Sequence, residues 1–149
     1  MDAVAKLTAI AAIKQLKAKY FLGVDTQDFD LLRKEVLCDT ISFQFSEFRK
    51  EPFTSADEVL AMFGEGLKGK HSVHHGHMPV IELTSQTTAK GIWAMEDRIY
   101  WGAPSDKVKG AMYLHGFGHY HETYAKTAAG WRIATVRLTR LHLKMNTIF

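Results

Sequence analysis

The chain has 149 residues, a length that suits one domain built around a single hydrophobic core. Apolar residues make up 46% and charged residues 23%, with three prolines, which excludes collagen-like, disordered and disulfide-rich chains. The formal net charge of +3 comes from basic residues that are scattered among acidic ones, whereas a nucleic-acid surface needs them clustered on one face. We therefore predict a single domain over residues 1–149 with no nucleic-acid partner.

Cys38 is the lone cysteine, so no internal disulfide can form, as is usual in a reducing compartment. The first residues lack the apolar block and cleavage site of a signal peptide. No window reaches the roughly 18 apolar residues of a membrane span. These features predict a cytoplasmic protein that makes no membrane contact.

Residues 3–22 form the clearest predicted helix. Apolar side chains recur every three or four positions from Val4 to Tyr20, and Lys14 and Lys17 stand between them. Gly23 weakens the pattern and is expected to end this helix.

Two shorter helices are predicted next. Asp28 is a candidate N-cap for a helix that runs to about residue 36. Ser55, with Glu58 three residues later, forms a capping box for a helix that runs to about residue 63.

The rest of the chain predicts strands. Residues 41–48 alternate apolar and polar side chains. Long runs rich in threonine, isoleucine, valine and aromatic residues follow at 72–84, 87–101, 109–126 and 131–144. Short breaks suited to hairpins separate these runs. Helices followed by strands favour an α+β fold over a parallel βαβ fold.

Strands much longer than the usual length of about five or six residues must bend. Gly76 and Pro79 in one run, and Gly116 and Gly118 in another, are candidate bulge or bend positions. A bent sheet has a concave side, so we predict N-terminal helices packed into it around an interior pocket.

The eight histidines concentrate in residues 71–77 and 115–121. Alternate strand residues share a face, so His75 and His77 should lie on one side and His74 on the other, unless Gly76 bulges. His115, His119 and His121 should line one face together. Most histidines at such positions are half-buried or surface groups.

Asp25 follows the first predicted helix among apolar neighbours, where a carboxylate is costly unless it is paired. It could serve as a turn or capping residue, but Asp28 is better placed for that. A buried carboxylate beside an imidazole orients the ring, selects its tautomer and raises the basicity of the other nitrogen. Asp25 and a strand histidine are therefore candidates for proton-transfer chemistry.

These motifs resemble a known family. Residues 25–34 resemble the segment after the first helix of scytalone dehydratase, and residues 12–21, 74–79 and 93–98 resemble bile-acid 7α-dehydratase. Both belong to the SnoaL-like group of the NTF2-like superfamily. The resemblance implies an NTF2-like (cystatin-like) cone, in which helices pack on a strongly curved, mixed but mostly antiparallel sheet that encloses a pocket. It also implies a homo-oligomer, either a dimer or a trimer.

The resemblance further implies an enzyme without a metal or organic cofactor. The reaction would be that of a carbon–oxygen lyase, a dehydratase that removes a proton next to a carbonyl and eliminates water. The substrate would be a small apolar or aromatic molecule of cyclic, polyketide or steroid type. The implied catalytic residues are His74, Asp25, Tyr20, Asp97 and Arg140, with Arg137 as the alternative to Arg140. The substrate-binding residues are expected to be Phe43, Phe63, Trp93, Met95, Met112 and His119.

Two positions depart from scytalone dehydratase: Val24 replaces a tyrosine, and Gly118 replaces a pocket serine. Three other functions stay open. An isomerase or cyclase would use the same base without a leaving group. A cupin-like metal site would use His119 and His121, but the glutamate that such a motif needs is missing, because Glu122 points the other way. A ligand-binding or association module would have no activity, since fold alone does not confer one.

Overall fold

The computed structural model of the protein describes residues 1–45, 49–105 and 111–147. Helix α1 spans Ala3–Asp25 and begins at Asp2, whose Oδ1 accepts a hydrogen bond from Ala5 N at 2.7 Å. The predicted end at Gly23 is wrong, because the helix continues through it. A Cβ at Gly23 would lie 2.6 Å from Leu32 Cδ2. Gly23 therefore permits close packing against the next helical segment.

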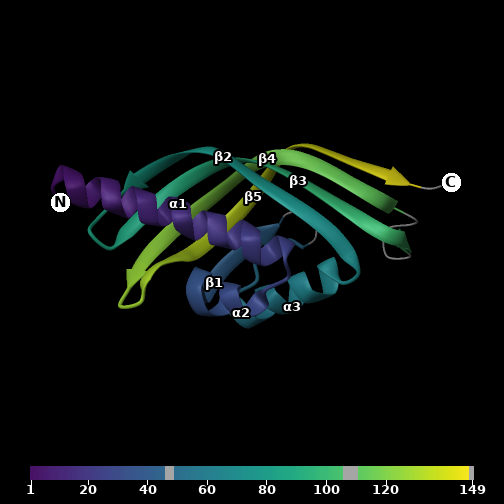
Figure 1. The fold of residues 1–149 in the computed structure, drawn as a ribbon, viewed down its shortest axis with the longest axis horizontal. Coiled ribbons are helices and arrows are strands. Elements are labelled where there is room, and N and C mark those ends of the chain that lie inside the picture. The colour runs from purple at the N-terminus through teal and green to yellow at the C-terminus, as the bar shows by residue number, and fades with distance from the viewer. Residues whose placement is uncertain (46–48, 106–110, 148–149) are drawn as a thin grey trace.

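The apolar face predicted for α1 holds only in part. Val4 and Leu7 are 74% and 68% exposed, whereas Ile13 and Tyr20 are buried. Figure 1 shows the N-terminal end of α1 reaching the margin of the molecule. The sheet therefore covers the second half of the helix, where the candidate site residues of α1, Tyr20 and Asp25, lie.

Three further helical segments follow: α2 at Phe29–Leu31, the π-helical turn η1 at Leu32–Val36 and α3 at Ala56–Leu67. The predicted N-caps are confirmed, since Asp28 Oδ1 accepts from Leu31 N at 2.9 Å and Ser55 Oγ from Glu58 N at 3.2 Å. The Glu58 carboxylate reaches back to Thr54 N at 2.8 Å.

The strands form one five-stranded sheet in the order β1-β5-β4-β3-β2. Strand β1 pairs with β5 in parallel, and the other pairs are antiparallel. Of the first predicted strand, residues 46–48 lie outside the described residues. The strands are β1 Leu37–Phe45, β2 Lys70–Leu83, β3 Thr88–Ser105, β4 Ala111–Thr127 and β5 Gly130–Thr147.

Figure 1 shows the long strands curving over α1, with β1, α2 and α3 beneath them. The register of β2 against β3 shifts between Gly76 and Pro79, and that of β4 against β5 shifts between Phe117 and Gly118. Such shifts bend a strand locally. The α+β prediction with a curved, mostly antiparallel sheet is confirmed. In the described part of the chain, no helix has the length and apolar character needed to cross a bilayer.

Candidate active site

Asp25 and His74 are in direct contact at the junction of α1 and β2. Asp25 Oδ1 lies 2.6 Å from His74 Nδ1, and Asp25 Oδ2 accepts a hydrogen bond from His74 N at 2.8 Å. The Ser72 hydroxyl donates to Asp25 Oδ1 at 2.9 Å. Because an ionised carboxylate only accepts hydrogen bonds, this arrangement selects the His74 tautomer with hydrogen on Nδ1. The other ring nitrogen, Nε2, then carries a free lone pair.

Phe21 holds the other side of the His74 ring. The two rings stack with centroids 6.4 Å apart and planes 12° from parallel. A Cβ at Gly76 would lie 2.5 Å from Phe21 Cε2, so glycine leaves the space that this ring occupies. The imidazole is thus positioned by Asp25 at its edge and by Phe21 on its face.

Asp97 and Arg140 form a second buried pair next to His74. Arg140 Nη1 and Nη2 donate to Asp97 Oδ1 and Oδ2 at 2.5 and 2.7 Å, and Asp97 is 3% exposed. Asp97 is the β3 residue opposite His74, so both side chains lie on the helix-covered face. Gly116 makes room for the pair, because a Cβ there would be 2.4 Å from Arg140 Nη1. The alternative residue, Arg137, is exposed.

Tyr20 is buried on the same face, and its hydroxyl donates a hydrogen bond to the hydroxyl of Tyr120. The ring centroids are 6.1 Å apart in an edge-to-face arrangement. Burial raises the pKa of both phenols, and the charge of Glu122 acts in the same direction on both. For Tyr120, Asp97 also raises the pKa and Arg140 opposes it. Both phenols therefore stay protonated at neutral pH and are able to donate hydrogen bonds.

Lys17 is a buried member of this site that the sequence analysis placed between the apolar positions of the helix. Its ammonium forms an ion pair with the buried carboxylate of Glu122. Tyr124 donates to Glu122 Oε2 at 2.5 Å and accepts from Trp93 Nε1 at 2.7 Å. Burial lowers the pKa of Lys17, and Glu122 opposes this shift.

Lys17, Tyr120 and Glu122 carried a signal that the sequence analysis missed. Lys17 is four positions after buried Ile13 and three before Tyr20, so it shares their helix face. Tyr120 and Glu122 alternate with His119 and His121, so they occupy the face opposite these histidines. Helix periodicity and strand alternation therefore place Lys17, Tyr120 and Glu122 on the buried faces of α1 and β4.

The predicted binding residues do not all gather in one place. Phe43 and Phe63 pack on Tyr20 with centroid distances of 6.5 and 6.3 Å. Trp93 anchors the Lys17 network, and Met95 Sδ lies 3.8 Å from Arg140 Nη1. Met112 is partly buried in β4. The buried polar groups are therefore surrounded by apolar side chains, namely those of Phe43, Phe63, Trp93 and Met95.

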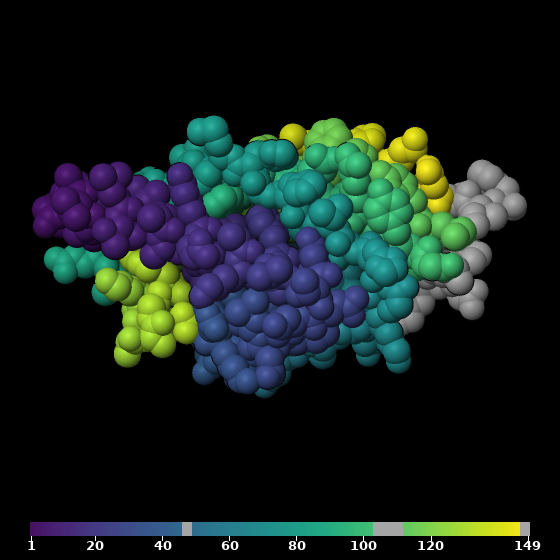
Figure 2. All heavy atoms as spheres, in the orientation of Figure 1, coloured from purple at the N-terminus to yellow at the C-terminus, as the bar shows by residue number. Residues whose placement is uncertain are grey.

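A hollow of about 520 Å³ lies between α1 and the sheet. In Figure 2, α1 runs beside the side chains of β2 on the face that is shown. Phe21, Gly76 and Trp93 line this hollow, and the Phe21 ring also stacks on His74. The full lining is Lys14, Lys17, Ala18, Phe21, Gly76, His77, Met78, Pro79 and Trp93.

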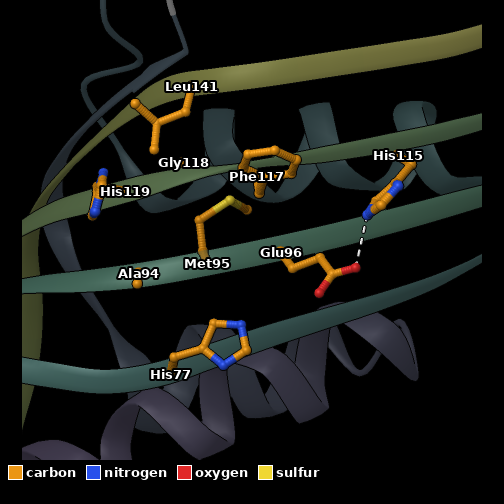
Figure 3. A pocket seen from close by; sticks show the side chains of 9 residues that line it. All are labelled: His77, Ala94, Met95, Glu96, His115, Phe117, Gly118, His119 and Leu141. Carbon is orange, nitrogen blue, oxygen red and sulfur yellow. Dashed lines mark hydrogen bonds and ion pairs between the residues drawn. The ribbon is translucent and has the colours of Figure 1, made fainter.

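His119 lies away from the catalytic candidates. It lines a groove of about 400 Å³ that also includes His77 and His115 (Figure 3). Since Tyr120 faces the helices, the adjacent His119 points to the opposite face of the sheet. Glu96 accepts a hydrogen bond from His115 Nε2 at 2.7 Å there, and Arg98 and His115 together lower the pKa of Glu96. His119 therefore lies on the face of the sheet opposite to His74.

Over residues 1–45, 49–105 and 111–147, no three histidine, cysteine or carboxylate side chains converge as a metal site would require. His121 Nε2 lies 3.0 Å from Thr139 Oγ1, and burial lowers the pKa of His121. The histidines of β4 thus engage neighbouring side chains on their own face of the sheet.

Comparisons with known proteins identify the fold and the family. A "Probable cyclase FGR4" of Gibberella zeae is 24% identical over 94% of this chain and 96% of its own length. A putative scytalone dehydratase from Novosphingobium aromaticivorans has a similar structure, with a TM-score of 0.83 at 15% identity, covering 99% of this chain and 94% of that one. An NTF2-like superfamily protein from Salmonella enterica gives a TM-score of 0.76 at 16% identity, covering 91% and 92%.

The fold is therefore the NTF2-like α+β fold, an open five-stranded mixed sheet packed with helices. The sequence model of the SnoaL-like domain matches residues 5–137, most of the chain. The protein belongs to the SnoaL-like family.

Proposed function

We propose that the protein is a cofactor-independent dehydratase that acts on a small cyclic β-hydroxyketone of polyketide or steroid type. The observation that carries the proposal is the Asp25–His74 contact, which leaves one imidazole nitrogen free as a base. The dehydratase named among the structurally similar proteins is consistent with it.

His74 Nε2 removes a proton from the carbon next to the substrate carbonyl. The electron pair of the broken C–H bond forms a C=C bond, and the carbonyl oxygen becomes an enolate oxygen. Asp25 stabilises the imidazolium that results and holds the ring in place. A positioned base of this kind contributes about 10²–10⁴-fold to a rate.

Tyr120, whose hydroxyl accepts the hydrogen bond from Tyr20, donates its own hydrogen to the developing enolate oxygen. Removing one donor of this type from an enzyme typically costs about 3 kcal/mol of transition-state stabilisation. The enolate then re-forms the carbonyl as the C–O bond at the β carbon breaks. The His74 imidazolium returns its proton to the departing hydroxyl, which leaves as water, and the Asp97–Arg140 pair hydrogen-bonds to it.

An isomerase or cyclase is the second candidate, because the same base and phenols would serve it and a similar protein is named a probable cyclase. It would return the proton to another carbon, or form a bond, without losing a group. Mass analysis of the product from a bicyclic β-hydroxyketone distinguishes the two, since only dehydration lowers the mass by one water.

Proton abstraction is tested without knowledge of the natural substrate by deuterium exchange into β-tetralone in D₂O, followed by NMR. The wild-type protein should accelerate exchange next to the carbonyl, and His74→Ala should lower the rate to that of buffer. His75→Ala is the matched control, because His75 is exposed on the same strand and should leave the rate unchanged. Exchange no faster than in buffer, or undiminished by His74→Ala, would overturn the proposal and leave a ligand-binding module.

A further inference from the structure

Lys17 and Glu122 form an ion pair that the proposed reaction does not use. The Lys17 side chain has 1% of its surface exposed and that of Glu122 has none. Withdrawing each charge from water carries a penalty of several kcal/mol, which the mutual attraction only partly offsets. Apolar side chains of similar volume are often as stable or more stable at such positions. Fold stability alone is therefore a weak explanation for the pair.

The position of the ammonium points to a use. Lys17 Nζ lies 4.1 Å from the centroid of the Tyr20 ring and 3.8 Å from that of Tyr120. It thus contacts both phenols whose hydroxyls are joined by a hydrogen bond. A third ring, that of Phe21, lies 4.7 Å away and packs on His74.

Glu122 holds the ammonium in this position. It comes from β4, two residues after Tyr120, so both side chains lie on the helix-covered face of one strand. The hydrogen bonds from Tyr124 to Glu122 and from Trp93 to Tyr124 fix the carboxylate in turn. The ion pair and the phenol pair are therefore one connected unit of α1, β3 and β4.

We infer that Lys17, anchored by Glu122, is a positioning residue that acts through Tyr20 and Tyr120 and strengthens the hydrogen bond that this phenol pair donates to an oxyanion of the substrate. This inference rests on the proposed function. A cation at a phenol ring stabilises the negative charge that the phenol oxygen gains as its proton shifts toward the substrate oxygen. The low local polarity makes that interaction stronger than it would be in water.

The test separates an effect on the phenols from an effect on folding. Lys17→Met leaves Glu122 buried without a cation and should lower the melting temperature. The double variant Lys17→Met/Glu122→Gln removes both charges and keeps an acceptor for Tyr124, so its melting temperature should return to near the wild-type value.

Two ligands that differ by one hydroxyl then report on the phenols. β-Naphthol resembles the enol of β-tetralone, whereas naphthalene lacks the oxygen. In the double variant the affinity for β-naphthol should fall about tenfold, because the phenols donate a weaker hydrogen bond without the cation at their rings, and that for naphthalene should stay within about twofold. Equal losses for both ligands, no loss for either, or no preference for β-naphthol in the wild-type protein would overturn the inference.

The control is the exposed Lys19–Glu35 pair, which joins the same helix to η1 at 2.6 Å. Lys19→Met/Glu35→Gln should leave both affinities unchanged. Because the binding assay needs no base, it is repeated in His74→Ala. If exchange survives in His74→Ala, the dehydratase proposal alone is refuted. If exchange is lost in His74→Ala but the double variant keeps its preference for β-naphthol over naphthalene, the role of Lys17 alone is refuted.

Discussion

Asp25 Oδ1 and His74 Nδ1 lie 2.6 Å apart although 49 positions separate the two residues in the chain. Asp25 is the last residue of α1, and His74 lies in β2. The contact exists because α1 lies against β2 and directs its C-terminal end at that strand. This short contact between a carboxylate and an imidazole ties helix and strand together, and in the proposed reaction it prepares His74 as the base.

Asp25→Asn should lower the turnover of the deuterium-exchange reaction by about 10²–10⁴-fold, the range expected for a positioned general base. The amide keeps the shape of the side chain but loses the charge that stabilises the imidazolium. Asp28→Asn is the matched control, because asparagine is also a good N-cap and the fold should be unaffected. Similar rates for the two variants would show that Asp25 has a structural role only.

Arg140→Met should lower the free energy of unfolding by about 3–5 kcal/mol, because it leaves the Asp97 carboxylate buried without its cation. Asp97→Asn/Arg140→Met should recover most of that loss, since no buried charge then remains. Urea denaturation measures both values. A single variant as stable as the double one would argue against a strong buried pair.

Gly118→Ala should mainly lower stability, whereas Gly76→Ala should mainly slow deuterium exchange. A Cβ at Gly118 would lie 1.9 Å from the backbone oxygen of Thr139, so the strand pair must move, and we expect a loss of about 2 kcal/mol or more. A Cβ at Gly76 meets the end of the Phe21 ring, which can rotate. Gly76→Ala should therefore keep most of its stability yet slow exchange, because the ring that stacks on His74 is displaced. Thermal melts and exchange rates on both variants decide this.

The protein should lose stability at alkaline pH. Burial raises the pKa of Tyr20, Tyr120 and Tyr124 above the value of about 10 that they have when unfolded. Above that pH the unfolded chain binds fewer protons than the folded one, so the free energy of unfolding falls as pH rises. Below about pH 10 the contribution is fully present. Urea denaturation from pH 8 to 11 should show the fall, and Tyr120→Phe should make it shallower.

Local sequence patterns determined the secondary structure. Apolar spacing, the N-caps Asp28 and Ser55, and long runs of strand-forming residues predicted the helices and strands close to their observed bounds. Alternation along a strand predicted which histidines share a face, but not which face the helices cover. Glycine at 23 misled the prediction of where α1 ends, because its reason is contact with Leu32, a neighbour that only the folded chain supplies.

The sequence by itself therefore determined the α+β class, because local propensity and periodicity depend on neighbouring residues. It also nominated Asp25 through its apolar neighbours, and the resemblance to the SnoaL-like family nominated His74. Only the tertiary structure decided that Lys17 is buried over Tyr20 and Tyr120, that it meets Glu122 from a strand 105 residues away, and that His119 lies on the far face from the base. The physical reason is that burial and charge pairing depend on which elements the sheet brings together. A lysine on a helix has the same local signature whether water or two phenol rings surround its ammonium.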